Sequence, residues 1–357
     1  MYQFTHTTQA SRVVFGAGTM KLVQQEVEKL GARRALILCT PEQRSQAEIV
    51  SLLLGPSSAG VFDGARMHVP LENARRARER VREVNADCAV AIGGGSTIGL
   101  GKAIALESAL PIVAIPTTYA GSEMTPIYGI TEGDRKKTGN DSRVLPRTVL
   151  YDPELSVGLP ARLSFASGLN AIAHAAEGLY SRDCHPVMAM MAEDGIRAMA
   201  AGLRAIKRNS ADMEARSECL YAAWLCGRVL GSVGMALHHN LCHALGGTFD
   251  LPHAETHAIV LPHALAYNSE AAPEAMSRIA RALGSTTAAG GIHELARELG
   301  IPAGLREIGL NERDLERARE IAMSNSYWNP RAMEKGPLDA LLRRAWEGSE
   351  PLPWSTP

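Results

Sequence analysis

A short apolar stretch that runs directly into three consecutive glycines constrains the fold of this chain more than any other feature. Residues 87–92 read Asp-Cys-Ala-Val-Ala-Ile, and residues 93–96 read Gly-Gly-Gly-Ser before a helical pattern that continues to about residue 106. Glycines at the turn from a strand to a helix let backbone N–H groups approach an anion, and the helix N-terminus adds partial positive charge. The loop therefore predicts a site for a nucleotide or another phosphate. Its candidate residues are Gly93, Gly94, Gly95 and Ser96.

Similar apolar runs flank this strand along the chain. Residues 35–39 and 111–115 read as buried strands, and residues 71–84 have helical periodicity. This alternation predicts a parallel sheet with helices on both faces. A second loop, 116–123, follows the third strand and is rich in hydroxyl groups, with Thr117, Thr118, Tyr119 and Ser122 as candidates. Because ligands bind beyond the carboxyl ends of parallel strands, we expect both loops to face one cleft.

The character of the sequence changes after residue 153. Clear strand patterns give way to runs rich in Ala, Leu, Met and Arg with helical spacing, at 169–180, 187–206, 213–230, 240–246, 275–283 and 292–299. We therefore predict an α/β protein with two domains: an N-terminal dinucleotide-binding parallel-sheet domain over 1–158, and an all-helical substrate domain over 159–357. The active site is expected in the cleft between them.

Composition excludes several classes of partner. Lys plus Arg (37) nearly balance Asp plus Glu (38), so no nucleic acid or membrane surface is expected as a partner. The N-terminus has no secretory signal pattern, and no apolar run approaches the length of a membrane span. The six cysteines form no CxxC pair, which favours reduced thiols in the cytoplasm.

Histidines gather in the second part of the chain. His174 follows Asn170 by four residues, His239 and His243 have the same spacing, and His253 comes after a Leu-Pro pair. Side chains four residues apart share one face of a helix, and such pairs commonly bring nitrogen donors to one point. A single histidine is usually a core or surface residue, but this set predicts a reactive centre.

With these motifs in view, the chain resembles the iron-containing alcohol dehydrogenase superfamily over nearly its whole length. The matching segments are 93–96, 116–118, 121–123, 152–153, 168–177 and 239–253. The resemblance implies a dinucleotide-binding α/β domain, an all-helical second domain, and a metal held by one Asp and three His. It also implies that the glycine loop and the hydroxyl-rich loop hold NAD(P).

Within the superfamily, residues 117–125 and 168–174 are similar to the maleylacetate reductase branch. Metal-dependent alcohol dehydrogenases carry Asp at the position of Asn170 and Gly after the last histidine, where this chain has Ala254 and Glu255. The branch implies reduction of the maleylacetate double bond to 3-oxoadipate with NADH or NADPH. That step belongs to bacterial breakdown of resorcinol, hydroxyquinol and chlorinated aromatics. The family also implies a homodimer.

The residue Asn170 changes what the histidines are expected to do. The superfamily's metal-binding histidines match His174, His239 and His253, but a neutral amide leaves a divalent ion without a protein carboxylate. A dicarboxylate substrate needs N–H donors, which imidazoles supply. We therefore predict a site that needs no metal, in which Asn170, His174, His239 and Tyr119 bind the substrate. Three His can still hold Zn²⁺, so metal binding stays open.

The expected reaction is a conjugate reduction. Hydride reaches the alkene carbon β to the ketone, and an enolate develops that protonated or N–H-donating histidines stabilise. His243 lies outside the matched metal set, so we expect it to relay the proton, with His253 as the second catalytic residue.

The preference between the two cofactors depends on the segment after the first strand. Thr40 is neutral where NAD-specific folds carry an acid, and Arg44 is a candidate partner for a 2′-phosphate. We predict that both cofactors work, with NADH at least as effective.

Three other functions are consistent with parts of the sequence. A metal-dependent alcohol or aldehyde dehydrogenase of the same superfamily is the first, and a lyase of the dehydroquinate synthase type is the second. A protein that only binds nucleotides is the third. Assays with maleylacetate and with simple aldehydes, with and without iron, separate the first from a maleylacetate reductase.

Overall fold

The computed structural model describes residues 4, 6, 11–133, 135–325 and 327–352, and the chain divides into two compact units, Met1–Leu159 and Pro160–Pro357. Each unit is described here by itself. Across the described residues, no helix is long and apolar enough to cross a membrane.

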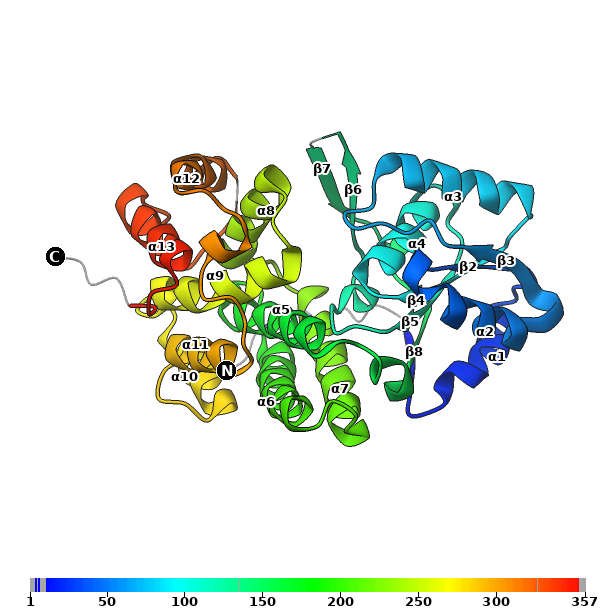
Figure 1. Ribbon diagram of the computed structural model, residues 1–357, viewed down its shortest axis with the longest axis horizontal. Coiled ribbons are helices and arrows are strands. Elements are labelled where there is room, and N and C mark those ends of the chain that lie inside the picture. Colours follow the sequence, from blue (N-terminus) through cyan, green and yellow to red (C-terminus); the bar gives the residue numbers. More distant parts are fainter. Residues whose placement is uncertain (1–3, 5, 7–10, 134, 326, 353–357) are drawn as a thin grey trace. The chain divides into compact units, whose positions relative to one another are not determined.

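The N-terminal unit is built on a parallel sheet of six strands in the order β1-β8-β5-β4-β2-β3 (Figure 1). The strands are β1 (Arg12–Phe15), β2 (Ala35–Leu38), β3 (Ser58–Phe62), β4 (Cys88–Gly93), β5 (Ile112–Pro116) and β8 (Thr148–Tyr151). All neighbouring pairs are parallel. The three predicted strands correspond to β2, β4 and β5, each displaced by no more than one residue. The predicted fold class is confirmed.

Helices cover both faces of this sheet, as the alternation along β2 requires. Ile37 packs with residues of α1 (Val23–Lys29) and α2 (Arg44–Leu54), whereas Leu36 and Leu38 pack with α3 (Leu71–Glu83) and α4 (Gly95–Ser108). Side chains point alternately to opposite faces of a strand, so a strand that is apolar throughout is buried on both sides. Short 3-10 helices complete the unit: η1 (Thr19–Leu22), η2 (Pro41–Gln43), η3 (Gly55–Ser57), η4 (Ser122–Met124), η5 (Ser142–Val144) and η6 (Pro153–Ser156).

A two-stranded antiparallel hairpin interrupts the parallel pattern after the second loop. It consists of β6 (Ile127–Glu132) and β7 (Arg135–Asn140). The sequence prediction did not include it, because its residues are only partly apolar and carry no sustained alternation. Its first strand begins two residues after Thr125, and it therefore fixes where the second loop ends.

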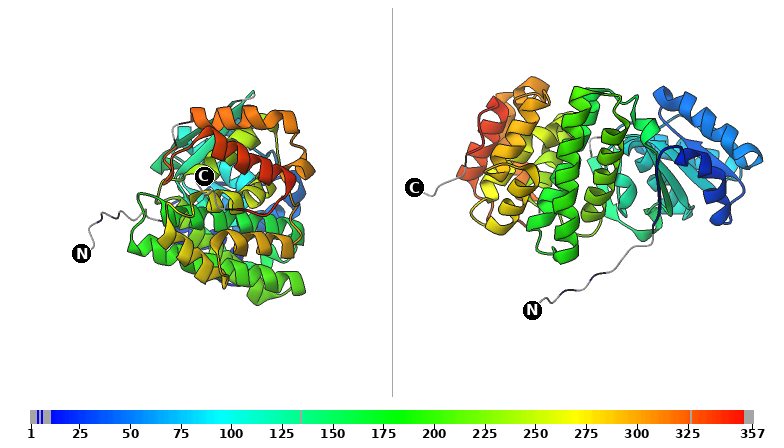
Figure 2. Two further views of the ribbon diagram at one scale, coloured as in Figure 1. Left: turned by 90° about the vertical axis from the view of Figure 1, so that its left-hand side faces the viewer. Right: turned by 90° about the horizontal axis from the view of Figure 1, so that it is seen from below.

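The C-terminal unit consists of helices, with no strand among its described residues. Its first three helices, α5 (Ala161–Tyr180), α6 (Pro186–Arg208) and α7 (Met213–Leu230), pack side by side (green in Figures 1 and 2). The remaining helices are α8 (Leu237–Phe249), α9 (His253–Asn268), α10 (Pro273–Leu283), α11 (Ala288–Glu298), η7 (Leu305–Ile308), η8 (Glu312–Asp314), α12 (Leu315–Ser324) and α13 (Lys335–Glu347). Helix α9 was not predicted as a helix, and it contains Pro262.

Candidate active site

The two loops of the N-terminal unit contact one another at the carboxyl ends of β4 and β5. The backbone N–H of Thr117 donates to the carbonyl of Gly93 over 3.1 Å. A Cβ on Gly94 would lie 2.8 Å from Cγ2 of Thr118, and one on Gly93 would lie 2.5 Å from Oγ1 of Thr97. Gly93 also has a φ of +151°, which other residues rarely adopt. These two glycines are therefore required by close packing.

The N-terminus of α4 fits an anionic group. Gly94 is its N-cap and offers no side-chain acceptor to the first turn. Oγ1 of Thr97 is buried without a partner among the described residues. An anion placed at this terminus would satisfy the free N–H groups and the positive end of the helix dipole. Ser96 lies within the first turn of α4, whose N-cap is Gly94, and the role of Ser96 toward a phosphate stays a prediction.

A buried lysine holds the second loop in place, and the sequence analysis did not find it. Nζ of Lys102, on α4, lies 2.7–2.9 Å from the carbonyls of Ser122, Thr125 and Ile127, and 2.9 Å from Oγ1 of Thr125. Burial lowers the pKa of Lys102 to about 7. The lysine therefore ties the loop that carries Ser122 to the helix that begins at the glycine loop.

Glu123 of the same loop is also fully buried. Its Oε1 accepts from the Tyr151 hydroxyl over 2.7 Å, and burial raises its pKa. Tyr119, predicted to touch the substrate, is itself completely buried. Its role stays a prediction.

In the C-terminal unit, α5, α8 and α9 bring the histidines together. The ring centroids of His174 and His239 lie 5.2 Å apart, and His257 lies 5.0 Å from His239 and 4.3 Å from His253. His238 and His257 were not assigned in the sequence analysis. The ring nitrogens of His238, His239 and His257 approach within 4.8 Å of one another. This set differs from the three histidines that match the superfamily's metal positions.

Glu177 orients the first turn of α8, and it too escaped the sequence analysis. It lies on α5 and is completely buried. Its carboxylate accepts from the backbone N–H groups of Ala236 (3.0 Å) and His238 (2.8 Å) and from the Tyr180 hydroxyl (2.9 Å). It also lies 2.6 Å from Nδ1 of His239. A carboxylate accepts only, so Nδ1 carries the proton and Nε2 presents a lone pair.

Several polar atoms of the cluster are buried without a partner among the described residues: Asn170 Oδ1, His174 Nδ1, His239 Nε2, and both ring nitrogens of His257. Buried polar atoms are almost always paired, so this concentration indicates that a polar ligand belongs here. An amide oxygen and imidazole nitrogens fit a divalent cation as well as a substrate with N–H or O–H groups. The residues present thus fit a metal, although none of these atoms carries negative charge.

Of the two forms expected for these imidazoles, protonated or neutral and N–H-donating, burial favours the neutral one at His174 and His239. Burial, followed by repulsion from neighbouring histidines, lowers the pKa of His174 well below its usual value. Burial also lowers the pKa of His238 to about 4 and that of His239 to about 3. These rings are neutral near pH 7, so the cluster without ligand is polar and not cationic.

His243 lies at the edge of the cluster, 6.1 Å from His239 between ring centroids. Its Nδ1 is 2.9 Å from the Tyr327 hydroxyl, a contact between α8 and the segment after α12. Burial raises the pKa of Tyr327, so the phenol stays protonated and can either donate to Nδ1 or accept from it. No signal in the sequence pointed to Tyr327.

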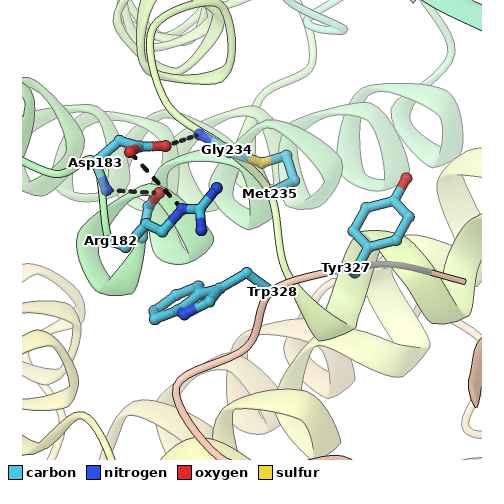
Figure 3. Close-up of a pocket in the computed structure, with 7 residues that line it drawn as sticks. Arg182, Asp183, Gly234, Met235, Tyr327 and Trp328 are labelled. Carbon is cyan, nitrogen blue, oxygen red and sulfur yellow. Dashed lines mark hydrogen bonds and ion pairs between the residues drawn. The ribbon is translucent and has the colours of Figure 1, made fainter.

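Tyr327 also lines a cavity of about 190 Å³ (Figure 3). The other lining residues are Ser181, Arg182, Asp183, Gly234, Met235 and Trp328. In Figure 3 the Tyr327 hydroxyl points away from Arg182 and Trp328. One face of this ring therefore borders the cavity while its hydroxyl contacts His243.

Comparison with known proteins places these features in a family. Residues 10–153 match the model of the iron-containing alcohol dehydrogenases, and residues 164–346 match the model of the C-terminal part of the Fe-containing alcohol dehydrogenase family. Maleylacetate reductase of Burkholderia cepacia is 56% identical over 351 residues, which cover 98% of this chain and 100% of that protein.

Two solved structures are also very similar. A protein of Ralstonia eutropha JMP134, provisionally described as an alcohol dehydrogenase, is 63% identical with a TM-score of 0.97, over 98% of this chain and 100% of that one. Maleylacetate reductase from Rhizobium sp. strain MTP-10005 is 50% identical with a TM-score of 0.94, over the same shares.

Proposed function

The chain belongs to the iron-containing alcohol dehydrogenase family, and we propose that it acts there as a maleylacetate reductase. It is an oxidoreductase, and NAD(P) is the cofactor class of its family. In our proposal it reduces the carbon–carbon double bond of maleylacetate to give 3-oxoadipate, in the bacterial breakdown of aromatic compounds. The observation that carries this proposal is the neutral, unpartnered donor set around Asn170, in a chain 56% identical to a maleylacetate reductase.

The absence of a carboxylate at position 170 spares a substrate with two carboxylates direct repulsion at this point. An acid at position 170 would repel such a dianion, whereas the amide of Asn170 has no charge and can also donate. We propose that Asn170, His174 and His239 contact the substrate. Tyr119 and His253 are further candidates from the sequence.

A bound dihydronicotinamide would supply hydride to the alkene carbon β to the ketone. The electron pair of the double bond then moves toward the ketone oxygen, and the resulting enolate takes up one proton at the neighbouring carbon. We assign that proton to Nε2 of His243 in its imidazolium form, which is left as a neutral imidazole with its remaining proton on Nδ1. Tyr327 keeps the imidazole in the required tautomer through the 2.9 Å contact at Nδ1. Such proton transfer contributes about 10²–10⁴-fold to rate in enzymes.

We further propose that the reaction needs no metal. A divalent ion would be held by Asn170, His174 and His239, with His253 at the remaining matched position, and it would polarise a carbonyl oxygen. Losing even one orienting partner typically weakens metal binding about 10–100-fold, and Asn170 removes a charged ligand. Stoichiometric iron or zinc in the purified protein, with activity lost on chelation and restored by metal, would contradict this part.

The glycine loop of the N-terminal unit is proposed to bind NADH, and NADPH as an alternative. The proposed contacts are Gly93, Gly94, Gly95 and Ser96 with the pyrophosphate, Thr117, Thr118 and Ser122 toward the nicotinamide, and Thr40 with the adenosine ribose. A homodimer in the cytoplasm is proposed from the family resemblance and the cysteine usage.

The deciding experiment measures NADH oxidation with maleylacetate and, in parallel, with simple aldehydes, each with and without added iron. We expect turnover with maleylacetate that iron does not increase, and little turnover with aldehydes. Iron-dependent turnover of aldehydes alone would instead identify a metal-dependent alcohol dehydrogenase. Bound cofactor that never exchanges hydride with free NADH would indicate a lyase.

A further inference from the structure

Charged side chains surround the position where a dinucleotide-binding fold recognises the adenosine ribose. Thr40 comes two residues after β2 ends, and β3 ends beside it, since Leu38 pairs with Phe62. The N–H of Cys39 donates to the Phe62 carbonyl, and that of Ala65 donates to the Cys39 carbonyl, both over 3.1 Å. The segments after β2 and β3 are therefore tied together at one edge of the sheet.

An arginine lies at this edge, and its charge is already compensated. NH1 of Arg44, the first residue of α2, is 2.7 Å from Oδ2 of Asp63, which directly follows β3. Its Nε is 3.0 Å from Oε1 of Glu48, one turn further along α2. The Arg44 guanidinium lowers the pKa of the Asp63 carboxyl through a hydrogen bond. Arg44, the candidate partner for a 2′-phosphate, thus already has two acidic partners.

The balance of charge around this arginine is negative. Three acids and two arginines lie here: Glu42, Glu48, Asp63, Arg44 and Arg66. Each of these charged groups interacts electrostatically with another member of the set or with Cys39. Folds that prefer NAD place an acid near the ribose 2′-hydroxyl, whereas an arginine nearby accommodates the 2′-phosphate of NADP. Both kinds of residue are present, and the acids are in excess.

We propose that the Arg44–Asp63 ion pair sets the preference of this protein between NADH and NADPH, and that Asp63 is the residue that favours NADH. A 2′-phosphate must compete with Asp63 for the Arg44 guanidinium, and the remaining acids repel it. The 2′-hydroxyl of NADH carries no charge and is spared this competition. The inference rests on the proposed use of a nicotinamide cofactor, but it does not depend on the identity of the reduced substrate.

The exposure of the pair limits how strong this preference is. The Arg44 side chain is 50% exposed and that of Asp63 44%. Exposed ion pairs are weak and screened by salt, so a 2′-phosphate can displace Asp63 at modest cost. NADH is therefore favoured, but NADPH is still accepted.

The test measures binding of two nucleotide fragments by calorimetry without substrate, 5′-AMP and 2′,5′-ADP, which differ only in the 2′-phosphate. We expect Asp63→Asn to tighten 2′,5′-ADP about tenfold relative to 5′-AMP at low salt, equivalent to about 1.4 kcal/mol. The gain should disappear in the Asp63→Asn/Arg44→Ala double variant. It should also shrink in about 1 M NaCl, where the Debye length is about 3 Å.

Glu83→Gln is the matched control. Glu83 is an exposed acid paired with Arg80 at 3.1 Å, at the end of α3 and five residues before β4 begins at Cys88. Glu83→Gln therefore removes one negative charge, as Asp63→Asn does, but far from the carboxyl ends of the strands. If Asp63→Asn leaves the ratio within twofold, or if the gain survives loss of Arg44, the inference is wrong. A protein that binds neither fragment contradicts the proposed cofactor use instead.

Discussion

The glycine loop and the histidine cluster differ in the groups that they offer to a ligand. The loop uses backbone: absent side chains at Gly93 and Gly94 allow Thr97 and Thr118 to approach closely. The cluster uses side chains from α5, α8 and α9, and it leaves buried polar atoms without partners. The first device tolerates any phosphate that reaches a helix end. The second places proposed substrate contacts and the proposed proton donor on side chains, so changes there should affect turnover more than cofactor binding.

The largest effect is expected at the cluster. His243→Ala should lower kcat about 10²–10⁴-fold, because it removes the proposed proton donor. Cofactor binding should stay unchanged, since the proposed cofactor contacts belong to the other unit. Steady-state kinetics with maleylacetate and calorimetry with NADH measure the two quantities.

Two further variants sharpen this result. Tyr327→Phe should cost about tenfold in kcat, the value of one hydrogen bond, because His243 keeps its proton but loses its orientation. His293→Ala, on α11, is the control and should be neutral. A loss below tenfold in His243→Ala would remove this residue from the mechanism.

A change of charge within the cluster should alter its ligand. Asn170→Asp introduces a carboxylate four residues before His174 on α5, and we expect Zn²⁺ affinity to rise at least about 10–100-fold. Reduction of maleylacetate should fall, because the new charge repels the dianion. Competition with a chelator measures the affinity, and Asn209→Asp, at the end of α6, adds the same charge elsewhere. Unchanged zinc binding would show that residue 170 does not face the donor set.

Substitutions in the glycine loop should weaken cofactor binding and leave kcat unchanged. Gly94→Ala places a Cβ 2.8 Å from Cγ2 of Thr118, and overpacking of this kind costs about 1–3 kcal/mol. We expect NADH affinity to fall about tenfold, with recovery in Gly94→Ala/Thr118→Ser, which removes Cγ2. Gly158→Ala, where no atom lies within 4 Å, is the control. If the double variant binds NADH no more tightly than Gly94→Ala, the contact with Cγ2 of Thr118 is not the cause of the lost affinity.

The last prediction concerns stability and not turnover or cofactor binding. The pKa of Lys102 is about 7 in the folded protein, against 10.5 for an ordinary lysine, so above pH 7 the unfolded chain holds a proton that the folded chain has lost. Stability therefore rises with pH between these values, by at most about 1.4 kcal/mol per pH unit. Urea unfolding at two pH values in this window should show the rise, and Lys102→Met should lack it. If the free energy of unfolding changes with pH in the same way in the unchanged protein and in Lys102→Met, Lys102 stays charged in the folded protein.

The same contrast explains what could be predicted from sequence. The strands β2, β4 and β5 and the glycine loop follow from contiguous residues, because period and turn chemistry are local. Spacing also identified His174, His239 and His243, each by a partner four residues away.

Other features depend on contacts between segments far apart in the chain. Glu177 acts on a helix that begins 60 residues later, and Tyr327 reaches His243 across 84 residues. The sequence around Lys102 indicates only a helix residue, because its burial and its hydrogen bonds come from the second loop and the hairpin. The charge state of the histidines could not be predicted for the same reason, because burial is a property of the fold and not of the spacing.

One consequence concerns how such a site can change over evolutionary time. Asn170 and Glu177 lie seven residues apart on α5, two helical turns along one face, with His174 between them. Glu177 keeps α8 and His239 in position, whereas in our proposal residue 170 sets the charge that the ligand meets. Under that proposal, a single substitution at 170 would change the class of ligand that the site accepts while the contacts that hold the scaffold stay in place.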